Sequence, residues 1–391
     1  MLFSNNPKRN MENQNIKPVY LDNAGTTKVH DEVASVMMEI LTESYYNPSA
    51  VTKMSIAVSK SIEKARGVIA KAMKITTPAN IFFTSGGTES NNLAILGNIG
   101  KPNHGKILCS ACEHPAIFNI FKDLKEKGYQ FEQIACNRDG SVNIQDFTAK
   151  ISSGNVQMVS IMHVNNEAGG VNNITALAKQ LKAKHPTAFF HSDGVQGFCK
   201  IKTSLDGIDA YSVSAHKING AKGVGALYVK NPQKLKSIVF GGGQEKAKRS
   251  GTENVAGIVG FAKAVEIWQA NNAEIIGNYK KYKEIITKEL ENVENMQINS
   301  SETSSPHILN ISFDGIRGET LLHMCEDSGY LIGMGSACSA KQPVSRPLKE
   351  MGITSNGTVR ISFSIFNTQS EIEEFAKVLK ENLLKLREIM K

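Results

Sequence analysis

The sequence predicts an α/β protein with a large, mainly parallel sheet, followed in the chain by a smaller α+β unit. Short apolar runs of strand length recur between residues 80 and 230, and helical segments such as residues 174–185 separate most of them. This alternation is typical of βαβ units, in which helices cover both faces of a parallel sheet. From about Val255 the pattern changes, which predicts the smaller unit.

Two helices are predicted before the sheet, over residues 31–41 and 56–73. The first would bury a stripe of apolar residues at helical spacing: Val33, Val36, Met37, Ile40 and Leu41. The strands of the sheet are assigned to six apolar runs: residues 80–85, 105–110, 156–164, 187–193, 209–215 and 225–230.

The C-terminal part begins with one long helical stretch over residues 255–293. A strand over 307–313, a helix, a strand over 358–364 and an amphipathic helix over 370–390 follow. We therefore expect three parts: an N-terminal segment that joins the small domain, 1–30; a large domain, 31–256; and a small C-terminal domain, 257–391.

Composition is that of an ordinary globular protein, with 41% hydrophobic and 21% charged residues among 391. The net charge of +8 comes from lysines that alternate with acids, as in residues 280–294, so we expect a solvated basic surface and no nucleic-acid partner. No apolar run is long enough to cross a bilayer, and the polar N-terminus, where Met11 is an alternative start, lacks a signal peptide pattern. These features predict a cytoplasmic protein without membrane contact.

The six cysteines are scattered, which argues against a disulfide framework. Cys109 and Cys112 form a lone C-x-x-C, and a structural zinc site would need a second pair that the sequence lacks. A redox pair is the alternative, but we expect most of the cysteines to be small buried hydrophobes.

A Gly-Gly-Thr turn joins a strand to a helix in residues 82–96. Backbone N–H groups at the helix start and the hydroxyl of Thr88, next to Gly87, would together bind an anion. The same turn is also a plain helix cap. No P-loop pattern and no G-x-G-x-x-G after a strand is present.

An acid and a lysine end neighbouring strands of the predicted sheet. Asp193 closes one apolar run and Lys217 follows the next, with glycines behind it. The two residues could form a structural ion pair. Together with the anion cradle they instead fit pyridoxal 5′-phosphate, with its pyridinium on Asp193 and its aldehyde on Lys217 as a Schiff base.

Eleven motifs then identify a family by resemblance. In order they are YLDNAGTTK, NPSA, TSGGTESNN, EHPA, MHVNNEAG, HSDGVQ, SAHKINGAKGVGALY, GGGQE, RSGTENVAG, GSACSA and VRISF. This series strongly resembles the NifS/IscS family of cysteine desulfurases, class V relatives of the aminotransferases, over nearly the whole chain from Tyr20. The resemblance implies a pyridoxal-phosphate-dependent transferase fold of type I, with a seven-stranded sheet in the large domain.

The resemblance also implies roles for matching residues. Lys217 would carry the cofactor and move the Cα proton, Asp193 would pair with the pyridinium, and His114 would stack on the ring and assist proton transfer. The remaining cofactor contacts would be Gly87, Thr88, Asn166, Gln196, Ser214, His216 and, from a second subunit of a homodimer, Thr252. The substrate contacts would be Arg360 on the carboxylate, helped by Asn47 and Asn166.

Cys338 lies in a Gly-, Ser- and Ala-rich segment that is typical of a loop. In the resembled family this cysteine attacks the sulfur of L-cysteine, holds it as a persulfide and releases L-alanine. The sulfur would pass to an acceptor such as an iron–sulfur scaffold or a tRNA thiolation protein. No metal site is expected, apart from transient ligation of an iron–sulfur species by Cys338. A selenocysteine lyase, an aminotransferase and a non-catalytic partner protein on the same fold are the alternatives.

Three departures from the family pattern stand near these residues. Gly25 and Lys28 replace the common Ala and Pro, NPSAVTK lacks a histidine of NPSSxH, and HKINGAKG replaces HKIYGPKG. The chain also ends soon after its last helix, which favours the NifS-like branch over the IscS-like branch.

Overall fold

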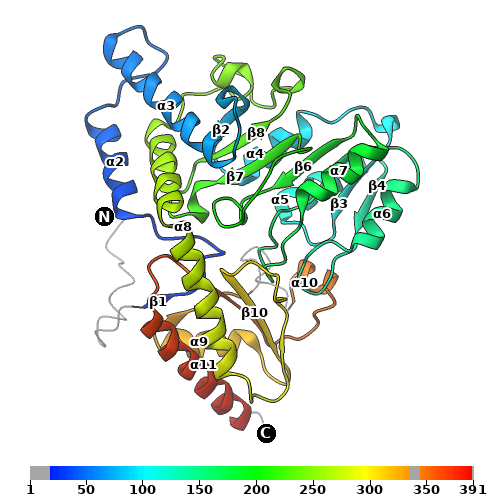
Figure 1. Cartoon of the computed structure of the whole chain (residues 1–391), viewed down its shortest axis with the longest axis vertical. Coiled ribbons are helices and arrows are strands. Elements are labelled where there is room, and N and C mark those ends of the chain that lie inside the picture. The colour runs from blue at the N-terminus through cyan, green and yellow to red at the C-terminus, as the bar shows by residue number, and fades with distance from the viewer. Residues whose placement is uncertain (1–17, 335–343, 390–391) are drawn as a thin grey trace.

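The computed structural model describes residues 18–334 and 344–389. It consists of a large unit around a seven-stranded sheet and a small unit around a three-stranded sheet, one above the other in Figure 1. Within these residues, no helix is long and apolar enough to span a membrane.

The large sheet has the strand order β2-β8-β7-β6-β5-β3-β4. Its strands are β2 (Ile81–Thr84), β3 (Lys106–Ser110), β4 (Phe131–Ile134), β5 (Val156–Ser160), β6 (Phe189–Asp193), β7 (Ala210–Ser214) and β8 (Gly225–Val229). The pairs between β4 and β7 are parallel, and β8 is antiparallel to both β2 and β7. The predicted α/β class with a mainly parallel, seven-stranded sheet is confirmed.

The helices of the large unit are α2 (Asp31–Thr42), α3 (Lys53–Ala72), α4 (Gly87–Leu96), α5 (Pro115–Glu126), α6 (Ile144–Ser152) and α7 (Ile174–Lys184). Side-chain caps fix where several of them begin: Thr52 accepts a hydrogen bond from the N–H of Ser55, and Asn173 accepts one from Ala176. The inner strands β3, β7 and β8 are wholly buried, since helices cover the sheet.

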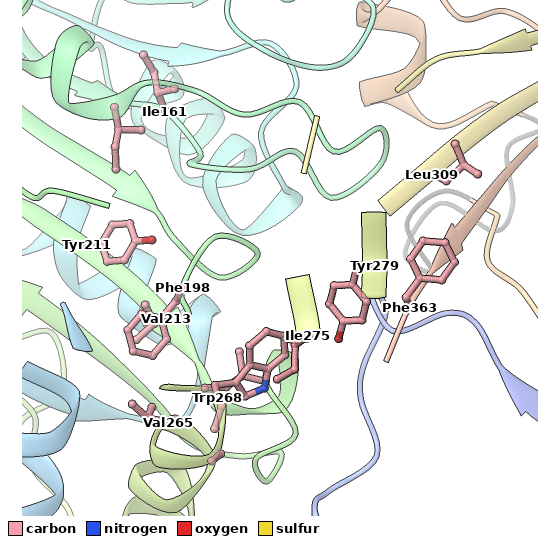
Figure 2. Packing of buried hydrophobic residues seen from close by; sticks show 14 of the residues in the cluster. Ile161, Phe198, Tyr211, Val213, Val265, Trp268, Ile275, Tyr279, Leu309 and Phe363 are labelled. Carbon is pink, nitrogen blue, oxygen red and sulfur yellow. The ribbon is translucent and has the colours of Figure 1, made fainter. Parts of the chain in front are cut away.

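The long helix α8 (Val255–Glu289) connects the two units. Figure 2 shows one continuous apolar core along it, in which Trp268 faces the side of the large sheet and Tyr279 lies toward Phe363. The rings of Tyr279 and Phe363 have centroids 6.1 Å apart. The two units therefore share a core across α8.

The small unit contains β9 (Met296–Ile298), β10 (Ile308–Phe313) and β12 (Thr358–Ser362) in the antiparallel order β12-β10-β9. Its helices are α9 (Gly318–Asp327), α10 (Arg346–Glu350) and α11 (Gln369–Ile389). The N-terminal β1 (Val19–Tyr20) pairs with β11 (Tyr330–Leu331) of this unit. The domain boundaries at residues 30 and 256 stay a prediction.

Two details differ from the expectation. The helix α2 buries only Val33 fully, and Leu41 is 61% exposed, because α2 packs on α8 through the face that carries Val33 and Met37, which lie beside Gly260. The edge strand β4 was missed, since its alternating residues Phe131–Ile134 are only partly buried and form no continuous apolar run.

Candidate active site

A cavity of about 270 Å³ lies beyond the carboxyl ends of the parallel strands, where α/β proteins bind ligands. Among its lining residues are ten of the predicted site residues: Gly87, Thr88, His114, Asn166, Asp193, Gln196, Ser214, His216, Lys217 and Arg360. They come from the ends of β6 and β7, the starts of α4 and α5, the loop after β5, and β12 of the small unit. The fold thus brings together residues up to 273 positions apart, since 360 − 87 = 273.

The start of α4 lines the cavity at the position where the sequence predicted an anion cradle. Its N-cap, Gly86, has φ +151°, and a side chain on Gly87 would come within 2.7 Å of Val195. Glycine at both positions keeps the backbone N–H groups of the helix start open to the cavity. On strand β8, a side chain on Gly225 would lie 2.7 Å from the Cα of Gly86, so this glycine also lets the two backbones approach.

Ser214 and His216 lie on the other wall of this cradle. The Nδ1 of His216 is 3.1 Å from the hydroxyl of Thr26. Burial and the nearby charge of Lys217 lower the pKa of His216 to about 3, so its ring is neutral at physiological pH. His216 therefore acts on an anion as a hydrogen-bonding group and not as a charge.

Asp193 is the last residue of β6 and is only 7% exposed. One carboxylate oxygen accepts a hydrogen bond from the Asn91 side chain at 2.7 Å, and the other accepts the Val195 N–H at 3.0 Å. These two bonds fix the carboxylate at the cavity wall and leave lone pairs for a further donor. Asn91 was not singled out from the sequence, although it stands in the quoted motif TSGGTESNN.

Lys217 follows β7 and directs its amine into the cavity, where Nζ donates to the carbonyl oxygens of Ala24 and Gly25, each at 2.5 Å. Burial and, to a smaller extent, the charge of Arg360 lower the pKa of Lys217 to about 8, while the charges of Asp22 and Asp193 oppose this shift. A substantial fraction of this amine is therefore neutral near pH 7 to 8, as a nucleophile or a base requires.

This shift predicts a pH profile. Below pH 8 the neutral fraction of Lys217 grows about tenfold per pH unit, and above its pKa it is constant. The rate of covalent pyridoxal phosphate uptake by the apoprotein should therefore rise with pH and level off near pH 8. Stopped-flow absorbance measures this rate. A rise that continues to about pH 10, as for an ordinary lysine, would contradict the buried amine.

His114 is the N-cap of α5, and its Nδ1 accepts the N–H of Ala116 at 3.1 Å. This bond places the proton of the neutral ring on Nε2. Burial lowers the pKa of His114, the nearby Asp193 opposes the shift, and Lys217 adds to it. A neutral ring with a fixed tautomer suits both stacking and proton transfer.

Gln196 is oriented by a residue that sequence reasoning missed. Its Nε2 donates to the carbonyl oxygen of Ala24 at 2.9 Å, and its Oε1 is 3.2 Å from Nε2 of His307. The other ring nitrogen of His307 bonds Ser305 at 2.6 Å. His307 precedes β10 of the small unit, so only the tertiary structure reveals this contact.

Arg360 projects from β12 and is 3% exposed. One terminal nitrogen donates to Asp22 at 2.8 Å, and the other donates to the backbone oxygen of Asn166 at 2.9 Å and lies 3.7 Å from Glu167. Two carboxylates thus compensate the burial of the guanidinium. Asp22 and Glu167 both stand in quoted motifs, but no local signal indicated that they flank Arg360.

Unsatisfied polar atoms line the cavity. Among the described residues, Nε of Arg360, Oδ1 of Asn166 and Oδ1 of Asn91 are buried and have no hydrogen-bond partner. Such atoms are costly unless a ligand or water satisfies them. The donor set, with an anion cradle, a carboxylate, an amine and open amide and guanidinium atoms, fits pyridoxal phosphate and an amino acid.

Three predicted site residues do not line this cavity. Asn47 is exposed and caps its own turn by accepting the N–H of Ser49 at 2.9 Å. Thr252 is also exposed. Cys338 lies outside the described residues.

Two departures from the family pattern have physical reasons. A side chain on Gly25 would approach the carboxylate of Asp22 to 2.6 Å, so glycine leaves Asp22 free to pair with Arg360. Asn219, in HKINGAKG, has φ +64°, which asparagine tolerates well. Its side chain donates to the Lys28 carbonyl oxygen at 2.9 Å and accepts a bond from Trp268 at 3.3 Å, which holds the loop behind Lys217.

Comparisons with known proteins identify the family. The family model for aminotransferase class-V matches residues 19–375. A "Cysteine desulfurase IscS" from Clostridium botulinum (strain Hall) is 35% identical over 387 residues, covering 95% of this chain and 96% of the relative. A "Cysteine desulfurase" from Trichormus azollae is also 35% identical and covers 94% of each chain.

Among solved structures, a "NIFS-LIKE PROTEIN" is 33% identical with a TM-score of 0.87, covering 94% of this chain and 100% of that one. The structure titled "SspA in complex with cysteine" is 30% identical with a TM-score of 0.75, covering 89% of this chain and 99% of that one. These matches cover almost the whole length of the chain. The chain belongs to the aminotransferase class-V family, in its group of NifS/IscS-type cysteine desulfurases.

Proposed function

We propose that this enzyme is a pyridoxal 5′-phosphate-dependent L-cysteine desulfurase, which converts L-cysteine to L-alanine and collects the sulfur as a persulfide on Cys338. The observation that carries the proposal is the convergence of a buried amine, a buried carboxylate, an anion cradle and a buried guanidinium on one cavity. The similarity to proteins named cysteine desulfurase supports the choice of substrate.

One group of cavity residues would bind the cofactor. Gly87, Thr88, Ser214 and His216 would hold the phosphate, Asp193 would keep a proton on the ring nitrogen, and Gln196 and Asn166 would hydrogen-bond the ring substituents. When bound, pyridoxal phosphate supplies an electron sink that weakens bonds next to an amino-bearing carbon.

Substrate handling falls to six side chains. The unpartnered Nε of Arg360 would donate to the substrate carboxylate, with Asn166, and on the family pattern Asn47, beside it. Lys217 would take and return the proton at the substrate Cα, with His114 assisting. Cys338 would then receive the sulfur, since a thiolate is the soft nucleophile that sulfur transfer needs.

The function is tested by product analysis. Cofactor-loaded protein supplied with L-cysteine and a thiol reductant should form alanine and sulfide in equal amounts. Formation of a 2-oxo acid product that depends on an added 2-oxo acid acceptor would indicate an aminotransferase. Turnover of selenocysteine without turnover of cysteine would indicate a selenocysteine lyase.

Replacing Arg360 with lysine should raise KM for L-cysteine. Lysine keeps the charge but lacks the planar fork that binds a carboxylate through two N–H groups. The loss of a hydrogen bond to a charged group, about 1.5–3 kcal/mol, corresponds to a rise in KM of roughly ten- to a hundredfold with a smaller change in kcat. Arg387→Lys, on α11 far from the cavity, is the control. Equal KM values for both variants would remove Arg360 from the substrate site.

A homodimer is part of the proposal. Thr252 is exposed. A parallel β-bridge between Val239 and Arg249 holds the two chain segments together, so Thr252, three residues after Arg249, lies near Phe240, which is 85% exposed. An exposed aromatic beside a predicted cross-subunit contact supports an interface here. Sedimentation should give a two-fold dimer, and Phe240→Asp should shift it toward monomer with weaker cofactor retention. A fully active wild-type monomer would contradict this.

The remaining assignments rest on the family. We propose that the sulfur passes to an iron–sulfur scaffold or a tRNA thiolation protein, in the cytoplasm. We also propose that the chain functions as the three predicted parts, 1–30, 31–256 and 257–391. Relatives with both NifS and IscS names support either branch, so the NifS-like assignment stays a prediction.

A further inference from the structure

The two cysteines of the C-x-x-C motif have different surroundings. Cys109 lies inside β3 and packs among Ile107, Ile117 and other residues of α5. Cys112 lies beyond the strand end and packs against Leu348 and other residues in and around α10. The motif therefore does not form a pair of its own, although both thiols are buried and free.

The partner of Cys112 is Cys136, which lies beyond the end of the neighbouring strand. In the parallel pair β3–β4, the last residues Ser110 and Ile134 lie opposite each other. Cys112 and Cys136 each follow two residues later, so the two cysteines leave the sheet side by side. Adjacent strands lie about 4.8 Å apart, within the range of Cα separations that disulfides span. Cys136 packs against the apolar cluster that contains Cys112, and both thiols are free.

The two thiols differ in character. The Cys112 side chain lowers the pKa of Cys136 against the effect of burial, and the backbone of Cys112, the side chain of Ser110 and the backbone of Ala111 lower it further. The same contact and burial raise the pKa of Cys112. Cys136 is also partly exposed, whereas Cys112 is fully buried. Cys136 thus has the lower pKa and the greater solvent access of the two thiols, and Cys112 is placed as its resolving partner.

Two charged groups lie close to the pair. Arg346 donates to the backbone oxygens of Ala111 and, at 2.6 Å, Glu113, and it lowers the pKa of Cys112. Burial raises the pKa of Glu113 to about 8, so its carboxyl is largely protonated at neutral pH and opposes a thiolate only weakly. The local charge balance therefore tolerates a thiolate at Cys136.

We propose that Cys112 and Cys136 form a peroxide-reactive pair that closes to a disulfide between the ends of β3 and β4. The Cys136 thiolate attacks one oxygen of hydrogen peroxide, the O–O bond breaks, and Cys136 sulfenic acid and hydroxide form. Cys112 then attacks the Cys136 sulfur, the S–O bond breaks, and a second hydroxide leaves as water. In sum, two thiols and one hydrogen peroxide give one disulfide and two waters.

The position of the pair links it to the active site. Cys112 stands two residues before His114, which lines the cavity, and its thiol contacts the Pro347 carbonyl oxygen of α10 at 3.8 Å. In Figure 1, α10 lies at the boundary between the two units. Disulfide formation would redirect the Cys112 sulfur from α10 toward β4.

The test is disulfide mapping on the cofactor-loaded protein. After brief hydrogen peroxide treatment, free thiols are alkylated in denaturant and the chain is digested with trypsin without reduction. A linked peptide pair, residues 107–122 with 128–138, should form, and fragmentation should place the bond on Cys112 and not on Cys109. The Cys338→Ser variant should give the same pair, which excludes exchange through Cys338.

Two controls make the result decisive. Burial raises the pKa of Cys199 to about 12, so this thiol should be oxidised at least about tenfold more slowly than Cys136. In Cys112→Ser, which keeps a hydroxyl donor, Cys136 should accumulate as a sulfenic acid that dimedone traps. The proposal is wrong if dimedone labels Cys136 in the unmodified chain as strongly as in Cys112→Ser and no linked peptide forms. It is also wrong if Cys136 stays reduced at peroxide doses that oxidise Cys199.

Discussion

Replacing Lys217 with alanine is expected to abolish covalent cofactor binding and to lower cysteine turnover by several orders of magnitude. The variant loses both the buried amine that holds the cofactor and the base for the Cα proton, and proton transfer alone accounts for roughly 10²- to 10⁴-fold in rate. Borohydride reduction of the unmodified protein, followed by peptide mapping, should find the pyridoxyl group on Lys217.

Lys230 offers a matched control for this prediction, because it is an exposed lysine just after β8 that lines neither the cavity nor the anion cradle. Lys230→Ala should retain the cofactor and most of the activity. Far-UV circular dichroism should show that Lys217→Ala is folded, since Lys217 contributes no apolar core contact. A pyridoxyl group on any other lysine would overturn the assignment.

Replacing Cys338 with serine should abolish sulfur transfer while leaving cofactor binding intact. The serine hydroxyl does not ionise at neutral pH and is a poor acceptor for sulfur, so alanine and sulfide release should fall by orders of magnitude. The absorbance of the bound cofactor should still change on addition of L-cysteine, since Lys217, Asp193 and the phosphate cradle are unaltered.

Cys199→Ser provides the comparison, since Cys199 lies outside the active-site cavity and forms part of the wall of a separate one. Its turnover should match that of the unmodified protein. If Cys338→Ser retains turnover near the parent rate, Cys338 is not the acceptor and a selenocysteine lyase becomes the better assignment.

The sequence predicted best those site residues that stand at the carboxyl ends of strands. Asp193 and Lys217 each follow a continuous apolar run, and the carboxyl ends of neighbouring parallel strands meet at one edge of the sheet. The placement of both residues at one cavity therefore follows from local patterns. The resemblance added Gln196, Asn166 and Arg360, which no pattern of period or spacing would have joined to the others.

The contacts between the two units could not be predicted in this way. His307 orients Gln196, and Asp22 and Glu167 pair with Arg360, across separations of 111 to 338 residues. Such pairs depend on how the small unit packs on the large one through α8, and this packing leaves no periodic signal in the sequence. The proximity of Cys112 to Cys136 was hidden for a similar reason, because β4 is a partly exposed strand without a clear apolar run.

The central claim is that Cys338 takes sulfur from L-cysteine. The most direct measurement is a single turnover, with cofactor-loaded protein in excess over L-cysteine, followed by quantification of alanine and mass mapping of the tryptic peptide 318–341. One alanine should form for each sulfur atom added to this peptide. The added sulfur should be on Cys338 and not on Cys325, and a reductant should release this sulfur as sulfide. Alanine formation with free sulfide and an unmodified Cys338 would contradict the account.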